Sequence, residues 1–285
     1  MVAFSSRLFN LATFLVIATL LTLEVQLIWG VKWLALSHVR QPWNVSSHCP
    51  KNREQRKKFG LVGYQTKLCK RVSEIMPAIM RASKDTRKVC QHQFRDRRWN
   101  CSTVDFVPKL SADLTRGTRE QAFVYALSAA AVTHGVAKAC SSGLIPYCPC
   151  GHVRPTHNLN EKNWKWGGCS DNVFYGKRVS VLWADAPWRR KRNRGTRMPK
   201  LQKYGAFAMA DGIRPPPQAR WEDFMNKDDG LTNPKAKMNQ HNNDVGRKIV
   251  ERSQKQKCKC HGISSGCEMK TCWKTLPSLH IIGAG

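Results

Sequence analysis

Long apolar runs are nearly absent from this sequence of 285 residues. The only one, from Leu11 to Leu23, has thirteen residues, fewer than the roughly twenty that a membrane-spanning helix needs. A run of this length after one early charge is typical of a secretory signal peptide. We therefore predict a signal peptide over residues 1–30, with cleavage after Gly30 and a mature start at Val31; a buried or amphipathic N-terminal helix is the alternative. No later stretch is long and apolar enough to serve as an anchor, which excludes a membrane-spanning mature protein.

Acidic side chains are also scarce. The chain has 19 Asp and Glu against 48 Lys and Arg, a formal net charge of +29. Such an excess favours a polyanionic partner. In a cytosolic chain it would indicate nucleic acid, but in an exported chain the available polyanions are heparan sulfate and anionic membrane surfaces, so we predict no nucleic-acid partner. For any single basic run, a solvated surface is the alternative.

An odd cysteine is also lacking: the chain has twelve, so every thiol can in principle pair. In an oxidising compartment an even set is expected to form a disulfide framework. Two sequons agree with export, one at Asn44-Val45-Ser46 and one at Asn100-Cys101-Ser102. We predict glycans at Asn44 and Asn100.

Residues from about 60 to 140 show helical spacing. In the stretch that ends at Cys140, Thr118 and Gln121 form a capping box, and Gly143 follows as a stop signal. Its alanines would let a neighbouring helix approach closely. We interpret His134 as a satisfied helix histidine rather than a ligand. An earlier helical pattern runs from Leu68 to Val89 and is interrupted at Pro77.

The sequence after Cys140 is of a different kind. It is rich in Cys-Pro-Cys, Gly and Trp, which predicts loops. Residues from about 188 to 230 are basic and lack periodicity, which predicts a disordered insert. Within it, Arg189-Arg190-Lys191-Arg192 matches the pattern that furin-type proteases cleave, with a solvated heparan-binding loop as the alternative. Helical spacing resumes weakly over residues 242–257. No internal repeat is visible.

The stretch CKCHGISSGCEMKTCW, from Cys258 to Trp273, allows three hypotheses. Four cysteines and His261 could form a zinc site, but the usual C-x2-C spacing is missing and export favours disulfides. Residues 262–266 match G-x-S-x-G, the nucleophile elbow of hydrolases, but that elbow needs a strand before the serine and a helix directly after it. The third hypothesis is a hairpin braced by two nested disulfides, Cys258–Cys272 and Cys260–Cys267. Its bridges would replace a hydrophobic core as the source of stiffness.

This stretch resembles the signature of the Wnt family of secreted signalling proteins, commonly written C-K-C-H-G-V-S-G-S-C-x-x-K-T-C-W. Three further stretches are similar to the family: RRWNCS at 97–102, GTREQAFVYALSAAAVTHGVAKAC at 117–140 and WKWGGCSDN at 164–172. VKWLALS at 31–37, together with the helix after Thr118, looks most like the Wnt-eleven branch. The resemblance covers nearly all of the mature chain except the basic insert.

The resemblance implies a covalent palmitoleate on Ser264, attached by the acyltransferase Porcupine, and no other cofactor, no metal and no catalytic residue. The carrier is expected to be Wntless. The lipidated hairpin, or thumb, is expected to dock in the cysteine-rich domain of a Frizzled receptor. We therefore expect receptor contacts along the tip, whose residues are His261, Gly262, Ile263, Ser264, Ser265 and Gly266.

The resemblance also implies the remaining disulfides. The expected pairs are Cys90–Cys101, Cys140–Cys148 and Cys150–Cys169, alongside the two hairpin bridges, Cys258–Cys272 and Cys260–Cys267. Cys49 and Cys69 are left over and could pair with each other.

Two departures from the family pattern stand out. The tip reads Ser264-Ser265-Gly266 where the family usually has Ser-Gly-Ser, so Ser265 becomes a rival acceptor. The chain also stops at Gly285, where the family continues into a second cysteine-rich domain.

The sequence thus predicts a mainly α, disulfide-rich protein. The expected parts are a helical N-terminal Wnt domain over 31–257, a β-hairpin thumb over 258–273 and a truncated end over 274–285. The predicted function is that of a secreted, extracellular Frizzled ligand in developmental signalling. The alternatives are a secreted heparan-sulfate-binding protein without receptor activation and a serine hydrolase that uses Ser264.

Overall fold

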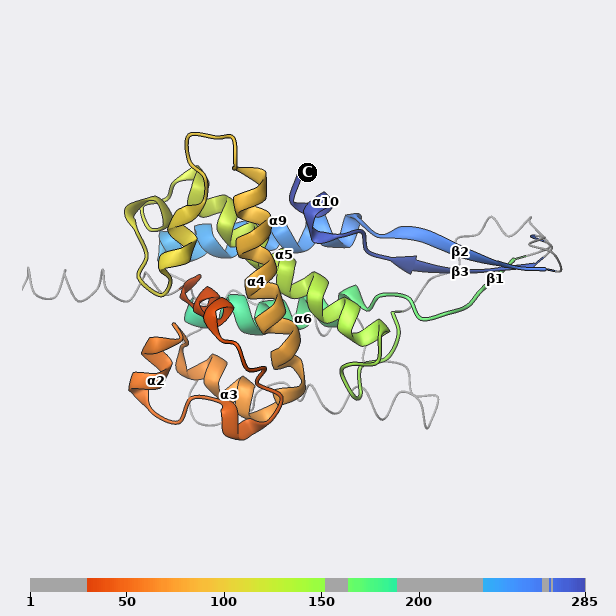
Figure 1. Ribbon diagram of the computed structural model, residues 1–285, viewed down its shortest axis with the longest axis horizontal. Coiled ribbons are helices and arrows are strands. Elements are labelled where there is room, and N and C mark those ends of the chain that lie inside the picture. The colour runs from red at the N-terminus through yellow and green to blue at the C-terminus, as the bar shows by residue number, and fades with distance from the viewer. Residues whose placement is uncertain (1–29, 152–163, 189–232, 263–266, 268, 285) are drawn as a thin grey trace, which may run out of the picture.

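The computed structural model of the chain describes residues 30–151, 164–188, 233–262, 267 and 269–284, and for residues 164–166 it describes the backbone (Figure 1). Within this part the α-helices and strands are α2 (Arg53–Lys58), α3 (Gly63–Arg71), α4 (Met76–Gln93), α5 (Arg119–Ser141), β1 (Trp164–Trp166), α6 (Val173–Ala184), α9 (Pro234–Arg252), β2 (Lys255–His261), β3 (Met269–Thr275) and α10 (Leu279–Ala284). Short 3-10 helices, among them η1 (Lys32–His38), connect them. The expected mainly α fold is confirmed.

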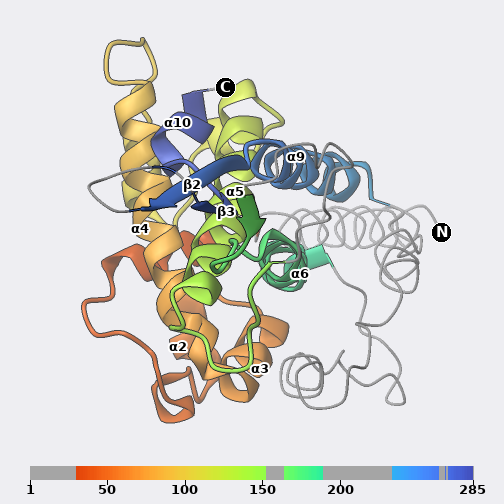
Figure 2. The same cartoon turned by 90° about the vertical axis from the view of Figure 1, so that its right-hand side faces the viewer.

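Helix α5 is the centre of the body, with α4, α6 and α9 packed around it (Figures 1 and 2). It starts where expected, because the Thr118 side chain accepts from the Gln121 N–H at 3.0 Å. The reciprocal bond differs from a capping box, since the Gln121 side chain accepts from the Gly117 N–H at 2.8 Å rather than from Thr118. The helix stops before Gly143, which has the positive φ of 72° that favours glycine.

Glycines of the neighbouring helices also allow close packing against α5, several of whose alanines are buried. A Cβ added at Gly246 of α9 would lie 1.9 Å from the Ala126 carbonyl oxygen, and one at Gly176 of α6 would lie 2.2 Å from that of Thr133. Real Cβ atoms never approach oxygen so closely. The helices therefore touch backbone to backbone at these two positions.

We expected no segment after the signal region to be long and apolar enough to cross a membrane. Judged by length and composition alone, this expectation is wrong. Among the described residues α5 passes that test, because its 23 residues are alanine-rich and carry few charges. However, 72% of its apolar window is buried inside the protein. The same composition therefore serves as the core helix of the body.

The helical pattern around Pro77 divides into two helices. Helix α3 ends at Arg71, and α4 begins at Met76 with Pro77 in its first turn. Proline is favoured there because the N–H that it lacks would have no partner within the helix. The interruption at Pro77 is thus the start of α4, whose buried face carries Ile79, Met80 and Val89.

Two helices differ from the expectation. Helix α6 lies in the region predicted as loop after Cys140, and α9 begins at Pro234, eight residues before the predicted spacing at 242. Ten of the twelve α6 residues are buried, so the sequence shows no polar face from which helical periodicity could be read. The start of α9 is set by Asn233, whose side chain accepts from the Lys235 N–H at 2.9 Å.

A buried ion pair joins these two helices. Arg247 of α9 donates to both carboxylate oxygens of Asp185, at 3.0 and 3.3 Å, and Asn243 donates to the same carboxylate at 2.7 Å. Burial alone would lower the pKa of Arg247, but the carboxylates of Asp185 and Asp244 outweigh it and raise that pKa. The arginine therefore stays charged in the core.

A sheet of three strands in the order β1-β3-β2 projects from the helical body (Figure 1). Strands β2 and β3 are antiparallel, and β1 lies parallel to β3 on its other side. Helix α10 follows β3 and returns to pack on α4 and α5. The body therefore holds both ends of the hairpin, through α9 before β2 and α10 after β3.

Candidate functional site

The candidate site is the hairpin formed by β2 and β3. Its register places Cys258 directly opposite Cys272, and the structure joins them by a disulfide with Cα atoms 4.0 Å apart. A second disulfide joins Cys260 to Cys267, with Cα atoms 4.8 Å apart. The two bridges are nested, as in the third hypothesis. The hairpin is longer than predicted, because β2 begins at Lys255 rather than at Cys258.

Side-chain packing contributes little to this hairpin. Every residue of β2 is exposed, and in β3 only Cys272 is fully buried. In the chain-entropy model, a bridge that closes a loop of about fifteen residues stabilises by about 3 kcal/mol. The disulfides therefore hold the hairpin in the place of a core.

The same disulfides weigh against the other two hypotheses. All four cysteine sulfurs of the hairpin are in S–S bonds, so they are not available as zinc ligands. Among the described residues no group of three or more His, Cys, Asp or Glu is arranged to hold a metal. The segment after the serines leads into strand β3, whereas a nucleophile elbow needs a helix there.

The tip carries the predicted acceptor. His261 and Gly262 are exposed at the end of β2. Ile263, Ser264, Ser265 and Gly266 lie outside the described residues, so the lipidation site and most of the predicted receptor contacts stay predictions. The basic stretch at 189–192 and the signal region at 1–29 also lie outside them.

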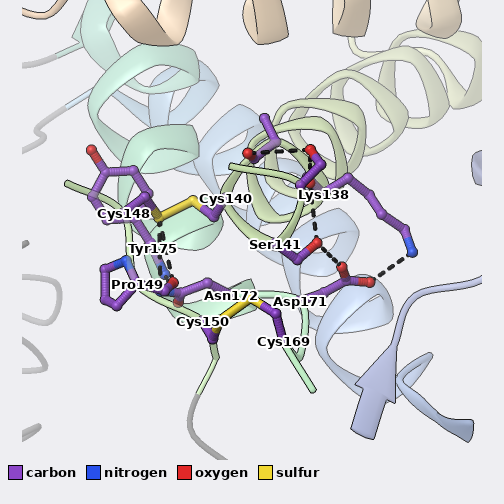
Figure 3. Close-up of a disulfide and its surroundings, with 12 residues drawn as sticks. Lys138, Cys140, Ser141, Cys148, Pro149, Cys150, Cys169, Asp171, Asn172 and Tyr175 are labelled. Carbon is purple, nitrogen blue, oxygen red and sulfur yellow. Dashed lines mark hydrogen bonds and ion pairs between the residues drawn. A yellow bond between two sulfur atoms is a disulfide. The ribbon is translucent and has the colours of Figure 1, made fainter. Parts of the chain in front are cut away.

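The base of the hairpin is bound to the body through Asp171, whose residue is 4% exposed (Figure 3). One carboxylate oxygen accepts from Lys138 at 2.7 Å, from the Leu276 N–H at 2.6 Å and from Thr275 at 3.0 Å. The other accepts from Ser141 at 2.5 Å. A single carboxylate therefore links α5 to the residues that leave β3.

Backbone bonds extend this junction. The Asp171 N–H donates to the Lys274 carbonyl at 3.0 Å, and the Lys274 N–H donates to the Ser170 hydroxyl at 3.0 Å.

Burial alone would raise the pKa of Asp171, but the hydrogen bonds from Lys138, Ser141 and the Leu276 N–H outweigh it and lower that pKa. The junction therefore requires the ionised carboxylate.

Helix α5 presents three polar side chains to the junction at helical spacing. They are His134, Lys138 and Ser141. The His134 Nε2 atom lies 2.9 Å from the Pro277 carbonyl oxygen, so this nitrogen must carry a proton and donate. Burial lowers the pKa of His134. The histidine is therefore a satisfied helix residue that positions the segment after β3.

Two further disulfides shape the segment that leads to Asp171 (Figure 3). Cys140 at the end of α5 pairs with Cys148, and Cys150 pairs with Cys169. Asn172 donates to the Pro149 carbonyl at 2.8 Å and also caps α6 by accepting from the Tyr175 N–H at 2.9 Å. The disulfides and Asn172 thus hold Asp171 near the end of α5.

The other predicted site residues lie on the helical body. Cys90 pairs with Cys101 and Cys49 with Cys69, so the twelve cysteines form six bridges. Both sequon asparagines, Asn44 and Asn100, are exposed. Their glycosylation stays a prediction.

Sequence reasoning missed the junction. Asp171 and Ser170 lie in the stretch WKWGGCSDN, which carried part of the resemblance, but nothing local indicated their partners more than 100 residues away. Lys138 and Ser141 lie in the predicted helix without any signal that they face the hairpin. Only the nearness of buried Asp171 to Cys169 could have drawn attention to it.

The fold and the hairpin define a disulfide-rich helical protein that projects a covalently braced finger. The Wnt family profile matches residues 57–211 and 218–285. The chain belongs to the Wnt family, whose members are signalling ligands and not enzymes.

Two relatives in the Wnt-11 group agree with this assignment. Protein Wnt-11b of Xenopus laevis is 38% identical over 252 residues, which are 88% of this chain and 59% of that protein. Protein Wnt-11 of Gallus gallus is 37% identical over 264 residues, 92% of this chain and 62% of that protein. This chain therefore spans about three fifths of the length of these relatives. The solved structure "Human WLS in complex with WNT8A" aligns at 29% identity over 73% of this chain and 56% of that one, with a TM-score of 0.44.

Proposed function

We propose that this chain is a secreted extracellular ligand of Frizzled receptors, with a palmitoleoyl ester on Ser264 of the hairpin tip. The observation that carries the proposal is the hairpin that projects from the helical body and is bridged by Cys258–Cys272 and Cys260–Cys267, with His261 and Gly262 exposed where the tip begins (Figure 1). We expect a serine hydroxyl at the end of such a hairpin to be within reach of an acyltransferase of the Porcupine type.

The chemistry of a lipid on this tip supports a receptor groove as its destination. Burying an acyl chain yields about 0.8 kcal/mol per methylene. A sixteen-carbon chain can therefore supply most of the affinity for the Frizzled cysteine-rich domain. The same chain would make the free ligand poorly soluble, which fits a carrier such as Wntless during export.

The acceptor is tested by intact mass of the secreted chain. We expect one mono-unsaturated sixteen-carbon acyl group on the wild type and on Ser265→Ala, and none on Ser264→Ala. The two serines are adjacent, so Ser265→Ala is the matched control. If Ser265→Ala loses the lipid and Ser264→Ala keeps it, the residue assignment is wrong; if no variant carries a lipid, the proposed function fails.

Receptor binding is tested with the same three proteins and an immobilised Frizzled cysteine-rich domain. We expect Ser264→Ala to lose binding while peptide mapping still gives all six disulfides. Undiminished binding by the unacylated protein would contradict the role of the lipid.

Exposed arginines favour a second candidate function, heparan-sulfate binding without receptor activation. Arg95, Arg97 and Arg98 are all exposed in the segment after α4. Arginine forks match sulfate oxygens in pairs. A chain that binds heparin in a salt-dependent manner and carries no acyl group would support this candidate over the first.

A further inference from the structure

Strand β2 carries three lysines on one face of the hairpin. Lys255, Lys257 and Lys259 occupy alternate positions, and alternate residues of a strand point to the same side. They span about 13 Å at the usual rise of a strand. We call these three residues the lysine face.

The residues opposite the lysine face complete an amphipathic surface. The register pairs Lys255 with Thr275, Lys257 with Trp273 and Lys259 with Thr271. At the end nearest the tip, His261 pairs with Met269, whose side chain is 51% exposed. The face therefore runs from cationic residues at the body to an exposed apolar side chain beside the tip.

The charges of the lysine face are not neutralised by the described part of the chain. All three lysines are exposed, and none of their ammonium groups has a hydrogen-bond or ion-pair partner among the described residues. Neither strand contains an acidic residue. Glu268, in the connecting segment, lies outside the described residues. The positive charge is thus available to a partner.

The type of basic residue on the hairpin indicates which class of anionic partner it suits. The two strands contain five lysines and no arginine, whereas the body exposes many arginines. Arginine is the residue suited to bidentate recognition of sulfate or phosphate, while lysine acts as a mobile point charge on a flexible stem. A row of lysines that ends beside the exposed Met269 is therefore suited to the delocalised negative potential of a lipid surface rather than to a fixed sulfate pattern.

We propose that the lysine face is a docking surface for anionic lipid headgroups. The proposal builds on the acylated tip proposed above, because a single acyl chain gives only marginal, reversible membrane binding and stable attachment needs a second signal such as a polybasic patch. The hairpin would supply both signals, with the lysine face lying on the headgroups and the tip at the bilayer.

The test measures partitioning of the full secreted chain to vesicles of phosphatidylcholine alone and of phosphatidylcholine with about 30% phosphatidylserine, a content that gives a negative surface potential. The main variant changes Lys255, Lys257 and Lys259 to Gln. The matched control changes Lys57, Lys67 and Lys70 to Gln, which removes the same charge from exposed positions of α2 and α3 on a remote part of the body (Figure 1). A third variant changes the lysine face to Arg.

Near an anionic surface each lysine contributes a factor of about five in affinity. We expect the Gln variant of the lysine face to lose on the order of a hundredfold in binding to the anionic vesicles. The Arg variant and the control should stay within about fivefold of wild type. Binding of wild type should fall as salt is raised, because exposed charges are screened. Equal losses in the lysine-face variant and the control, or no dependence on phosphatidylserine, would overturn the proposal.

Two further measurements distinguish lipid binding by the lysine face from glycan binding and from the effect of the acyl chain. If the lysine-face variant elutes earlier from heparin than the control and binds vesicles unchanged, the face binds a sulfated glycan and the lipid proposal is wrong. Ser264→Ala tests the acyl chain separately. We expect loss of the acyl chain to lower the affinity for both kinds of vesicle and to leave the ratio of the two affinities unchanged. Strand β2 is an outer strand, so size-exclusion chromatography checks that the loss of lysines does not cause edge association.

Discussion

Lys138 of α5 and Asp171 form an ion pair of 2.7 Å that joins the core helix to the base of the hairpin. The Asp171 residue is 4% exposed, and the same oxygen also accepts from the backbone of Leu276. This carboxylate therefore adds a side-chain link between the core helix and the base of the hairpin to the attachments through α9, α10 and the backbone bonds of the junction.

Asp171→Asn should lower the free energy of unfolding by about 2–3 kcal/mol, because an amide places donors against the Lys138 and Leu276 donors. Thermal or denaturant unfolding measures the loss. The control is Asp96→Asn, which removes an exposed ion pair with Arg95 and should cost less than about 1 kcal/mol. Equal effects of the two variants would show that the junction is no stronger than a surface pair.

The pH dependence of stability should have an acid component from Asp171. Its pKa is lowered in the folded protein, so its contribution is fully present above the unfolded value of about 3.9 and is lost as pH falls through the folded pKa. Wild type should therefore lose stability more steeply below about pH 4 than Asp171→Asn does. Parallel curves for the two proteins in that range would contradict the assignment.

His134 should contribute a second component at higher pH. Burial lowers its folded pKa, so the unfolded chain binds the proton first and stability falls as pH drops below the unfolded value of about 6.5. His134→Gln keeps a donor for the Pro277 carbonyl and removes the titration. We expect its stability curve to be flatter than that of wild type between about pH 6.5 and 5, as measured by unfolding in matched buffers.

Much of the fold could be predicted from local sequence, and the junction could not. The start of α5 followed from Thr118 and its end from Gly143, because caps and stops act through the neighbouring backbone. Helix α6 was missed because its residues are buried on nearly every side, which removes the polar face that periodicity depends on. The partners of Asp171 are close only after folding, so no pattern in the sequence indicates them.

The hairpin bridges should act locally. Replacing Cys260 and Cys267 by Ser should increase proteolysis and hydrogen exchange in the hairpin with little change in the unfolding of the body, because the hairpin shares almost no core with it. Replacing Cys258 and Cys272 should have the larger effect, since that bridge closes the longer loop and Cys272 is buried. Non-reducing peptide mapping of the wild type checks the pairs, and a Cys258–Cys260 bond would contradict the nested arrangement.

The last prediction concerns the helix contacts that support the whole arrangement. Gly246→Ala would place a methyl group 1.9 Å from the Ala126 carbonyl oxygen, and Gly176→Ala would place one 2.2 Å from that of Thr133. In both cases the obstacle is backbone of the core helix, so α9 or α6 must move away from α5. We expect each variant to cost about 3 kcal/mol or more, since overpacking of this kind is not relieved by a side-chain rotation.

Gly135→Ala is the matched control for these two variants. It is also a helix glycine on the α5 interface, but its added methyl group would lie 3.4 Å from the Ala78 carbonyl oxygen, at the edge of ordinary contact. Alanine is favoured over glycine within a helix by about 1 kcal/mol, so this variant should be neutral or stabilised in thermal unfolding. A Gly246→Ala protein as stable as Gly135→Ala would show that α5 and α9 are not in backbone contact at Gly246, and α9, which leads directly into β2, would then be held to the body by side chains such as Arg247.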